Sequence, residues 1–197
     1  MPPVIYLLRH GLTDANRNGV IAGTFESKLL PEGMEQSRQA GVFLKKISKI
    51  KKIGRIFCSP MIRTRETLKA LKLGKIPTQF DDRLREFNCG IYEGRPDSAI
   101  PERLSRANVF AHPNRVRTGG ECVNDIRRRV RSFIGEKLSP LSSSAPVLII
   151  SHGGAGSVIL WELLPRLTAE IIKVEIRNAE VWKIEGGKYE RVFEPDK

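Results

Sequence analysis

The sequence has few cysteines and no long apolar run. Its three cysteines, Cys58, Cys89 and Cys122, are too few and too scattered for a disulfide framework, and no two have the spacing of a metal or redox pair. The longest apolar stretches, such as residues 147–150 and 158–164, fall far short of the roughly 20 residues that span a bilayer. The first residues lack the pattern of a signal peptide. We therefore expect a cytoplasmic protein in a reducing compartment, with no membrane partner.

Basic residues outnumber acidic ones. The chain carries 34 lysines and arginines against 22 aspartates and glutamates, for a formal charge of +12. This excess favours an anionic partner, but nucleic acid, anionic lipid and small phosphorylated metabolites all meet that description. Apolar residues make up 40% of the 197 residues, which is enough to bury a core. The length suits a single domain over residues 1–197.

Short apolar runs predict the strands of the fold. Residues 4–8 and 147–150 are continuous apolar runs that end in polar residues, and residues 53–58 form a weaker run of the same kind. Such runs are typical of strands buried on both faces of a parallel sheet. Residues 171–176, 179–185 and 189–193 predict closing strands, with the last two joined as a hairpin.

Helical patterns lie between these runs, at residues 31–46, 61–71, 123–138 and 156–164. Strands that alternate with helices predict an α/β fold of three layers, with a mostly parallel central sheet between two layers of helices. Residues 95–120, which contain three prolines, interrupt this alternation. They predict a lid-like insertion over the edge at which the strands end.

Two of the three histidines follow buried strands. His10 and His152 each stand directly after an apolar run and directly before a glycine, whereas His112 lies in the lid-like insertion. The carboxyl ends of parallel strands meet at one crevice, where glycine lets the backbone approach a ligand. We therefore expect His10 and His152 in one site and His112 at the surface.

Arginines stand beside the same strand ends. Arg9 adjoins His10, and Arg63 lies in the first turn of the helix that follows residues 53–58. The planar guanidinium group matches phosphate oxygens, so both arginines are candidates to bind a phosphoryl group. Arg65, in contrast, is expected to be solvated.

Four segments, in order along the chain, resemble the histidine phosphatase superfamily, also called phosphoglycerate-mutase-like. They are residues 8–16 (LRHGLTDAN), 59–67 (SPMIRTRET), 84–94 (LREFNCGIYEG) and 151–154 (SHGG). The resemblance implies a phosphoglycerate-mutase-like fold and hydrolysis of phosphomonoesters through a phosphohistidine intermediate on His10. It also implies that Glu86 is the proton donor. From its position alone, Glu86 could instead pair with Arg83 or Arg85.

The other residues of the pattern would bind the substrate. A phosphoryl group in transfer spreads negative charge over its oxygens, so its site needs fixed positive charge and hydrogen-bond donors. By match to the family's pattern, the phosphoryl oxygens would be neutralised by Arg9, Arg63 and His152, and the substrate would be bound by Thr13, Asn16 and Gly153.

No metal and no cofactor is expected. A pocket of arginines and histidines already supplies the positive charge that Mg²⁺ or Zn²⁺ would bring. The sequence has no HExxH motif, no clustered carboxylates and no GxxxxGK[ST] motif of ATPases. The expected partner is a small phosphorylated substrate.

Two alternatives remain open at this point. A phosphoglycerate mutase would use the same chemistry and pass the phosphoryl group to a second hydroxyl, although mutases of this family tend to be longer. A basic nucleic-acid-binding module would use runs such as Arg127-Arg128-Arg129. That run lies on an amphipathic helix, and no aromatic surface accompanies it, so nucleic acid is not expected as the main partner. The edge strands leave a homodimer open.

Overall fold

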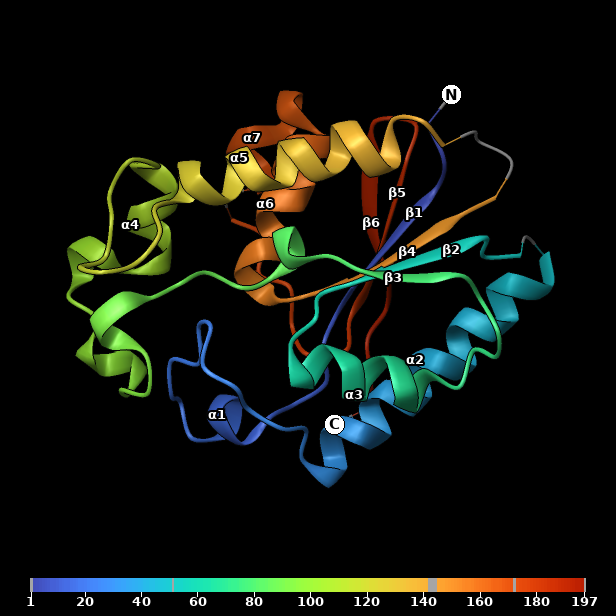
Figure 1. Cartoon of the computed structure of the whole chain (residues 1–197), viewed down its shortest axis with the longest axis horizontal. Helices are drawn as coiled ribbons and strands as arrows, with labels where there is room; N and C mark the ends of the chain where they lie inside the picture. The colour runs from blue at the N-terminus through green and yellow to red at the C-terminus, as the bar shows by residue number, and fades with distance from the viewer. Residues whose placement is uncertain (1, 51, 142–144, 172, 197) are drawn as a thin grey trace.

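The centre of the fold is a six-stranded sheet with the strand order β3-β2-β4-β1-β5-β6. The computed structural model describes residues 2–50, 52–141, 145–171 and 173–196. Figure 1 shows the sheet between its helices. The strands are β1 (Ile5–Arg9), β2 (Arg55–Cys58), β3 (Thr78–Phe80), β4 (Val147–Ser151), β5 (Val181–Glu185) and β6 (Lys188–Phe193).

The three strands expected from apolar runs form the parallel middle of the sheet. β4 pairs in parallel with β1 on one side and with β2 on the other, with Leu8 and Cys58 both opposite Ile150. Every residue of β4 is buried, which explains why its sequence shows no alternation. The short edge strand β3 was not expected; it is three residues long and only partly buried.

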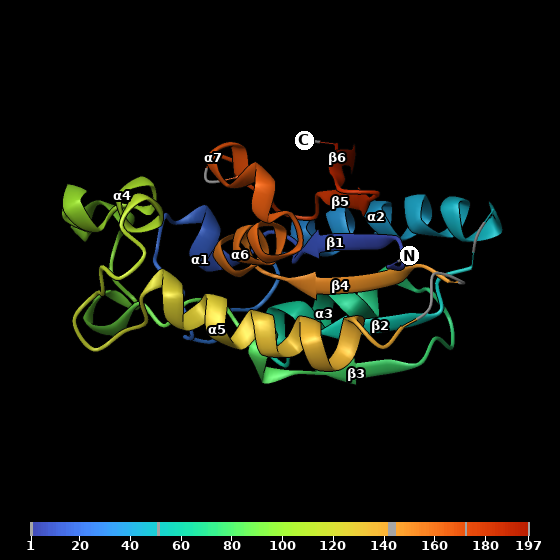
Figure 2. The same cartoon turned by 90° about the horizontal axis from the view of Figure 1, so that it is seen from above.

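Helices cover both faces of the sheet, so the three-layer α/β/α prediction is confirmed. The α-helices are α1 (Asp14–Arg17), α2 (Pro31–Ile50), α3 (Ile62–Leu71), α4 (Arg106–Ala111), α5 (Val123–Phe133), α6 (Gly153–Leu163) and α7 (Thr168–Ile171). Figures 1 and 2 show α5 and α6 on one face and α2 and α3 on the other. Leu7 packs in the α5 and α6 core, whereas its neighbour Leu8 packs in the α2 and α3 core. No helix among the described residues is long and apolar enough to cross a membrane.

The prediction of a strand at residues 171–176 is wrong. Residue 172 lies outside the described residues, α7 ends at Ile171, and residues 173–176 belong to no strand. Ile171 and Ile176 are buried while Glu175 between them is exposed, so the apolar residues of this segment pack into the core near α6 without forming a strand. The carbonyl of Ile176 accepts a hydrogen bond from the Arg9 side chain instead of from a neighbouring strand.

The hairpin and the long helices follow the prediction with shifted ends. β5 and β6 pair antiparallel through Gly186 and Gly187, both at positive φ. The expected helix at 123–138 is α5 followed by a π-helical turn, η5 (Ile134–Leu138). α6 begins at Gly153, three residues before the expected start, because its first residues are glycines with no apolar periodicity to reveal them.

Residues 90–120, called here the entry segment, form a long insertion between η1 and α5, and the two ends of the insertion lie together. The segment holds the short turns η2 (Gly90–Tyr92), η3 (Asp97–Ala99) and η4 (Glu102–Leu104), together with α4. Its two ends touch: a Cβ on Gly90 would lie 2.0 Å from the Thr118 carbonyl oxygen, and the amide of Ile91 donates to that oxygen at 3.0 Å. The remaining turn, η1 (Asp82–Leu84), precedes the segment, and η6 (Pro165–Leu167) precedes α7.

Candidate functional site

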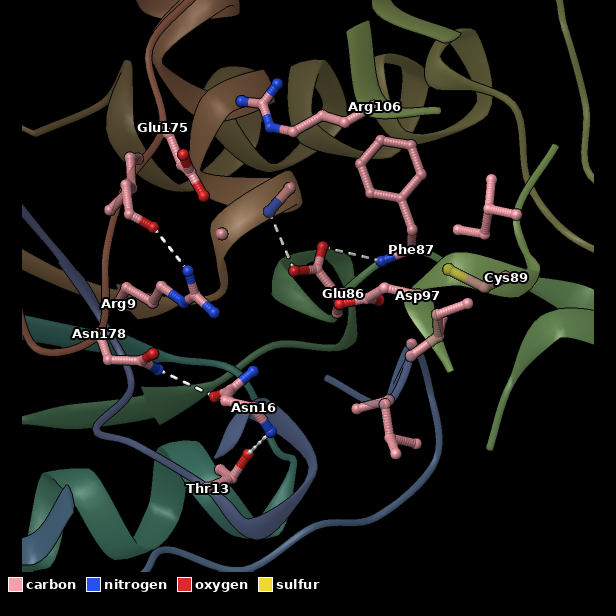
Figure 3. Close-up of a pocket in the computed structure, with 18 of the residues that line it drawn as sticks. Arg9, Thr13, Asn16, Glu86, Phe87, Cys89, Asp97, Arg106, Glu175 and Asn178 are labelled. Carbon is pink, nitrogen blue, oxygen red and sulfur yellow. Dashed lines mark hydrogen bonds between the residues drawn. The ribbon is translucent and has the colours of Figure 1, made fainter. Parts of the chain in front are cut away.

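A cavity of about 790 Å³ opens at the carboxyl ends of β1 and β4. Figure 3 shows side chains from distant parts of the chain around it. Its size suits a small ligand rather than a phosphate ion alone. The residues that the sequence singled out and that line it are Arg9, His10, Thr13, Asn16, Arg63, Glu86 and Gly153.

His10 is held in one tautomer. It is only 4% exposed, and its Nδ1 lies 2.8 Å from the carbonyl oxygen of Gly11. A carbonyl can only accept, so Nδ1 carries the proton and Nε2 keeps its lone pair. Burial, together with the positive charges of Arg63 and Arg9, holds the pKa of His10 well below its ordinary value. A neutral imidazole with a free Nε2 is the nucleophilic form.

Arg63 and His152 form a hydrogen-bonded line behind His10. Arg63 Nε donates to His152 Nδ1 at 3.1 Å, and His152 Nε2 lies 2.8 Å from Ser59 Oγ. The rings of His10 and His152 are 5.3 Å apart. His152 is 1% exposed and sits behind the wall of the cavity rather than on it. Burial and Arg63 lower its pKa well below the ordinary value, so it accepts from Arg63 as a neutral ring.

Arg9 presents a guanidinium group with an unfilled donor. Its Nη1 donates to the Ile176 carbonyl at 2.7 Å, while the buried Nε has no hydrogen-bond partner. The group lies against Gly153, where an added Cβ would be 3.1 Å from Nη1. A buried donor without an acceptor is costly. Arg9 is therefore suited to bind an anionic oxygen that enters the cavity.

Glu86 binds the first turn of α6. Its Oε2 accepts from the Gly154 amide at 2.9 Å, and its Oε1 accepts from the amides of Ala155 at 2.8 Å and Phe87 at 3.0 Å. Neither ion pair that the sequence left open is present, because Arg83 pairs with Asp81 and Glu136, and Arg85 pairs with Asp82. The carboxylate therefore lies at the cavity wall, on the positive end of a helix.

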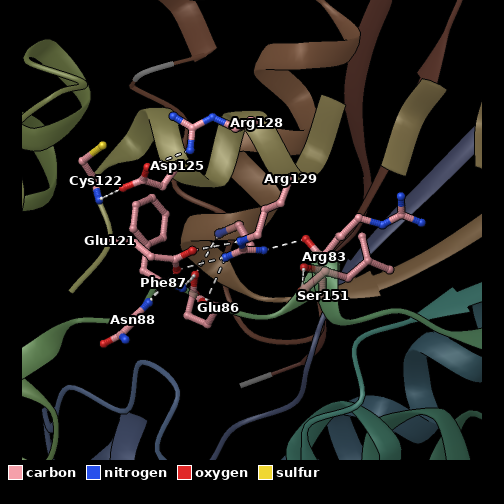
Figure 4. Close-up of polar contacts among 12 residues, drawn as sticks. Arg83, Glu86, Phe87, Asn88, Glu121, Cys122, Asp125, Arg128, Arg129 and Ser151 are labelled. Carbon is pink, nitrogen blue, oxygen red and sulfur yellow. Dashed lines mark hydrogen bonds and ion pairs between the residues drawn. The ribbon is translucent and has the colours of Figure 1, made fainter. Parts of the chain in front are cut away.

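Arg129 on α5 holds the segment that carries Glu86 (Figure 4). Its guanidinium group donates to the carbonyls of Arg83 at 2.5 Å and Glu86 at 3.2 Å, and it pairs with Glu121 at 3.2 Å. Glu121 in turn accepts from the Asn88 amide at 2.9 Å. The segment 83–88 is thus fixed at both ends, by Arg129 of α5 and by Glu121, two residues before that helix.

Sequence reasoning missed Asn178, which ties three parts of the site together. Its Nδ2 lies within hydrogen-bond distance of the His10 carbonyl at 3.1 Å, the Gly11 carbonyl at 3.2 Å and Asn16 Oδ1 at 3.0 Å. Thr13 caps α1 by accepting from the Asn16 amide at 3.1 Å. Nothing near Asn178 in the sequence marks it, because its partners lie more than 160 residues away. Ser59 follows β2 at the same edge of the sheet, and its hydroxyl binds His152, a contact that the sequence does not reveal.

The arginine run on α5 is bound within the protein. Arg127 Nε and Arg131 Nε each lie 2.5 Å from the buried Glu162 carboxylate of α6, and Arg129 is bound as described above. Arg128 and Arg131 are the more exposed members, with side chains 78% and 60% exposed. The run therefore fastens α5 to its neighbours and does not form a free cationic face, so the nucleic-acid-binding alternative is not favoured.

Among the described residues, no three His, Cys, Asp or Glu side chains gather in a way that could hold a metal ion. The donors around the cavity are mainly arginines and backbone amides, which bind anions.

Comparison with known proteins agrees with this geometry. The sequence profile described as "Histidine phosphatase superfamily (branch 1)" matches residues 5–194. "Putative phosphoserine phosphatase 2" of Hydrogenobacter thermophilus is 30% identical over 96% of this chain and 93% of its own. "Probable phosphoglycerate mutase GpmB" of Erwinia tasmaniensis is 30% identical over 92% of this chain and 84% of its own.

Solved structures agree on the fold. The alpha-ribazole phosphatase from Shigella flexneri superposes with a TM-score of 0.76 at 22% identity, over 95% of this chain and 94% of that one. With a profile match over nearly its whole length, the chain belongs to the histidine phosphatase superfamily.

Proposed function

We propose that this enzyme hydrolyses small phosphomonoesters through a phosphohistidine intermediate on His10. The observation that carries the proposal is the state of His10: it is buried, it is neutral, and it is held by the Gly11 carbonyl so that Nε2 keeps its lone pair. The guanidinium groups of Arg9 and Arg63 line the same cavity, and the ring of His152 lies 5.3 Å from that of His10. This is an arrangement for a phosphoryl group in transfer.

The first half-reaction forms the covalent intermediate. His10 Nε2 attacks phosphorus, the bond from phosphorus to the ester oxygen breaks, and Glu86 gives a proton to the departing oxygen. Arg9, with its unfilled donor, and Arg63 neutralise the equatorial oxygens.

The second half-reaction restores the enzyme. Glu86, now ionised, takes a proton from a water molecule that attacks phosphorus, and the bond from phosphorus to His10 Nε2 breaks. Asn16 and Thr13, which line the same cavity, would orient the substrate, as would the Gly153 backbone. These residues supply the charge and the protons of both steps, so we propose that the reaction needs no metal.

We further propose that the chain acts as one domain in which residues 95–120 enclose the substrate. Eight residues of the entry segment line the cavity: Asp97, Ile100, Glu102, Ser105, Arg106, Val109, Phe110 and Arg117. Such a wall selects the alcohol part of the ester.

Replacement of His10 tests the mechanism. We expect His10→Ala to abolish phosphate release from p-nitrophenyl phosphate, because no other nucleophile is placed at phosphorus. Wild-type activity should persist in EDTA. His112→Ala is the matched control, since His112 is exposed and does not line the cavity, and it should retain full activity. Activity retained in His10→Ala would overturn the mechanism.

A mutase would pass the phosphoryl group to a second hydroxyl instead of to water. Mutase activity is the second candidate, because the relative from Erwinia tasmaniensis is named a probable phosphoglycerate mutase. Incubation with a phosphoglycerate separates the two reactions: a phosphatase releases inorganic phosphate in step with substrate loss, whereas a mutase yields the positional isomer without net release. We expect phosphate release.

A further inference from the structure

Buried side-chain atoms without a hydrogen-bond partner mark two arginines of the same cavity. Among the described residues, these atoms are Arg9 Nε, Arg117 Nε and Ser48 Oγ. Both arginines line the cavity, and Ser48 does not. Folded proteins rarely leave a buried donor unfilled. The feature that suits Arg9 to a phosphoryl oxygen therefore recurs at Arg117.

The Arg117 guanidinium group has few hydrogen-bond acceptors and no ion-pair partner among the described residues. The residue is 7% exposed. Its Nη2 donates to the Leu104 carbonyl at 2.9 Å, and its Nη1 has only the sulfur of Cys89 at 4.0 Å. Burial raises the pKa of Cys89 to about 12, so this thiol is neutral and offers no counter-charge. Arg63, in comparison, donates to three acceptors at 3.1 Å or less.

No carboxylate of the described part of the chain forms an ion pair with Arg117. The acidic residues of the cavity wall other than Glu86 are Asp97, Glu102 and Glu175, and all three are exposed. A buried guanidinium group without an anion is expensive to desolvate. A bound anion would both fill the open donors and balance the charge.

The position of Arg117 relates it to the leaving group. Figure 3 shows Cys89, which Arg117 contacts, on the other side of Glu86 from Arg9. A phosphoryl group at Arg9 and His10 has its ester oxygen at Glu86, so the alcohol part extends toward Cys89 and Arg117. Phe87, Val109 and Phe110 supply apolar surface to the same cavity, beside the charged residues Asp97, Glu102 and Arg106.

We propose that Arg117 binds an anionic group on the alcohol part of the substrate, and that the enzyme selects phosphomonoesters whose leaving group carries a carboxylate or a second phosphate. The proposal rests on the proposed function for the placement of the phosphoryl group. Arg117 takes no part in the chemical steps, so it sets specificity and leaves the reaction itself unchanged.

Kinetics with matched substrates test the proposal. Phenyl phosphate carries no second charge, 4-carboxyphenyl phosphate adds a carboxylate, and 1,4-phenylene bisphosphate adds a phosphate. Arg117→Met keeps much of the side-chain volume and removes the charge. We expect it to lower kcat/KM for the two substituted substrates by ~10- to 100-fold, as loss of a charged hydrogen bond does, and to change phenyl phosphate turnover by less than about twofold.

Arg115→Met is the matched control. Arg115 lies two residues away and donates to the Arg103 carbonyl at 2.9 Å, but it does not line the cavity. Arg115→Met should leave kcat/KM unchanged for all three substrates. Arg117→Lys keeps a positive charge and should restore part of the preference, which guards against a variant that merely folds poorly. Equal losses on all three substrates, or none, would overturn the proposal. A loss on one substituted substrate alone identifies carboxylate or phosphate as the group that is bound.

Binding of non-hydrolysable ligands separates this proposal from the proposed function. Calorimetry should show that the wild type binds 4-carboxyphenylphosphonate more tightly than phenylphosphonate, and that Arg117→Met removes the difference. If the preference is present but no ester is hydrolysed, the proposed function fails and the assignment of Arg117 stands. If hydrolysis depends on His10 but the preference is absent, the assignment of Arg117 fails alone.

Discussion

Burial sets the charge state of the site. His10 and His152 are 4% and 1% exposed and share the positive field of Arg63, so both are neutral near pH 7. Motif spacing predicted which histidines and arginines would meet, because their strands end at the same edge. It could not predict Asn178, whose segment carries no local signal, or that Ser59 would bind His152.

Folding stability should fall as pH drops below neutrality. The two buried histidines have folded-state pKa values below their ordinary value near 6.5, whereas the unfolded chain takes up a proton at that value. The unfolded state therefore binds more protons, and stability is complete above pH 6.5 and lost below it. Between pH 7 and pH 5.5 each histidine should remove ~1 kcal/mol from the free energy of unfolding, as measured in urea.

Variants of single histidines check the source of this pH dependence. His10→Asn should lose less stability between pH 7 and pH 5.5 than the wild type by about the share of one histidine. His112→Asn removes an exposed histidine and should follow the wild-type curve. A His10→Asn protein with an unchanged pH dependence would contradict the assignment.

Side-chain contacts between elements decide where Glu86 lies. The segment 83–88 has little regular structure beyond η1, and its carbonyls are bound by Arg129 of α5. Amphipathic spacing predicted α5, but it could not show that Arg129 faces inward while Arg128 faces solvent. The strand expected at 171–176 failed for a related reason: apolar alternation reports burial, and burial of Ile171 and Ile176 is achieved without a partner strand.

Loss of Arg129 should release the Glu86 segment. Arg129→Met removes donors to two backbone carbonyls and leaves the half-buried Glu121 without its ion pair, which typically costs ~1–3 kcal/mol of stability. Because Glu86 would lose its alignment, we expect kcat to fall by roughly tenfold with little change in KM. Urea unfolding and steady-state kinetics measure the two effects.

The neighbouring arginine provides the comparison. Within the described ranges Arg128 pairs with Asp125 alone, and it is largely exposed, so Arg128→Met should change stability by less than ~0.5 kcal/mol and leave kcat unchanged. Similar kcat values for the two variants would mean that α5 does not position Glu86.

The fold class could be predicted from the sequence because three buried apolar runs and the helices between them fix the layers. The whole molecule also carries the +12 charge, part of which is bound in pairs such as those of Glu162 with Arg127 and Arg131. The sequence could count these charges but not show which are paired. The cytoplasmic location and the homodimer stay predictions.

The remaining positive charge should attract anionic substrates. We expect kcat/KM for phenyl phosphate to fall several-fold as NaCl rises from ~20 to ~200 mM, because salt screens the long-range attraction, while kcat stays constant. Lys45→Glu with Lys46→Glu, two exposed positions on α2, lowers the net charge and should flatten the dependence. A parallel fall of kcat would show that salt acts on the chemical steps instead.

The touching ends of the entry segment have a consequence for how this enzyme could diversify. Thr118 and Ile91 close residues 90–120 into a loop whose start and finish stay together whatever lies between them. Closing a longer or shorter loop costs little extra entropy. The segment between Gly90 and Gly120, which lines the space for the alcohol part of the substrate, could thus be replaced by another sequence. The strand ends that carry His10 and Arg9 would remain in place.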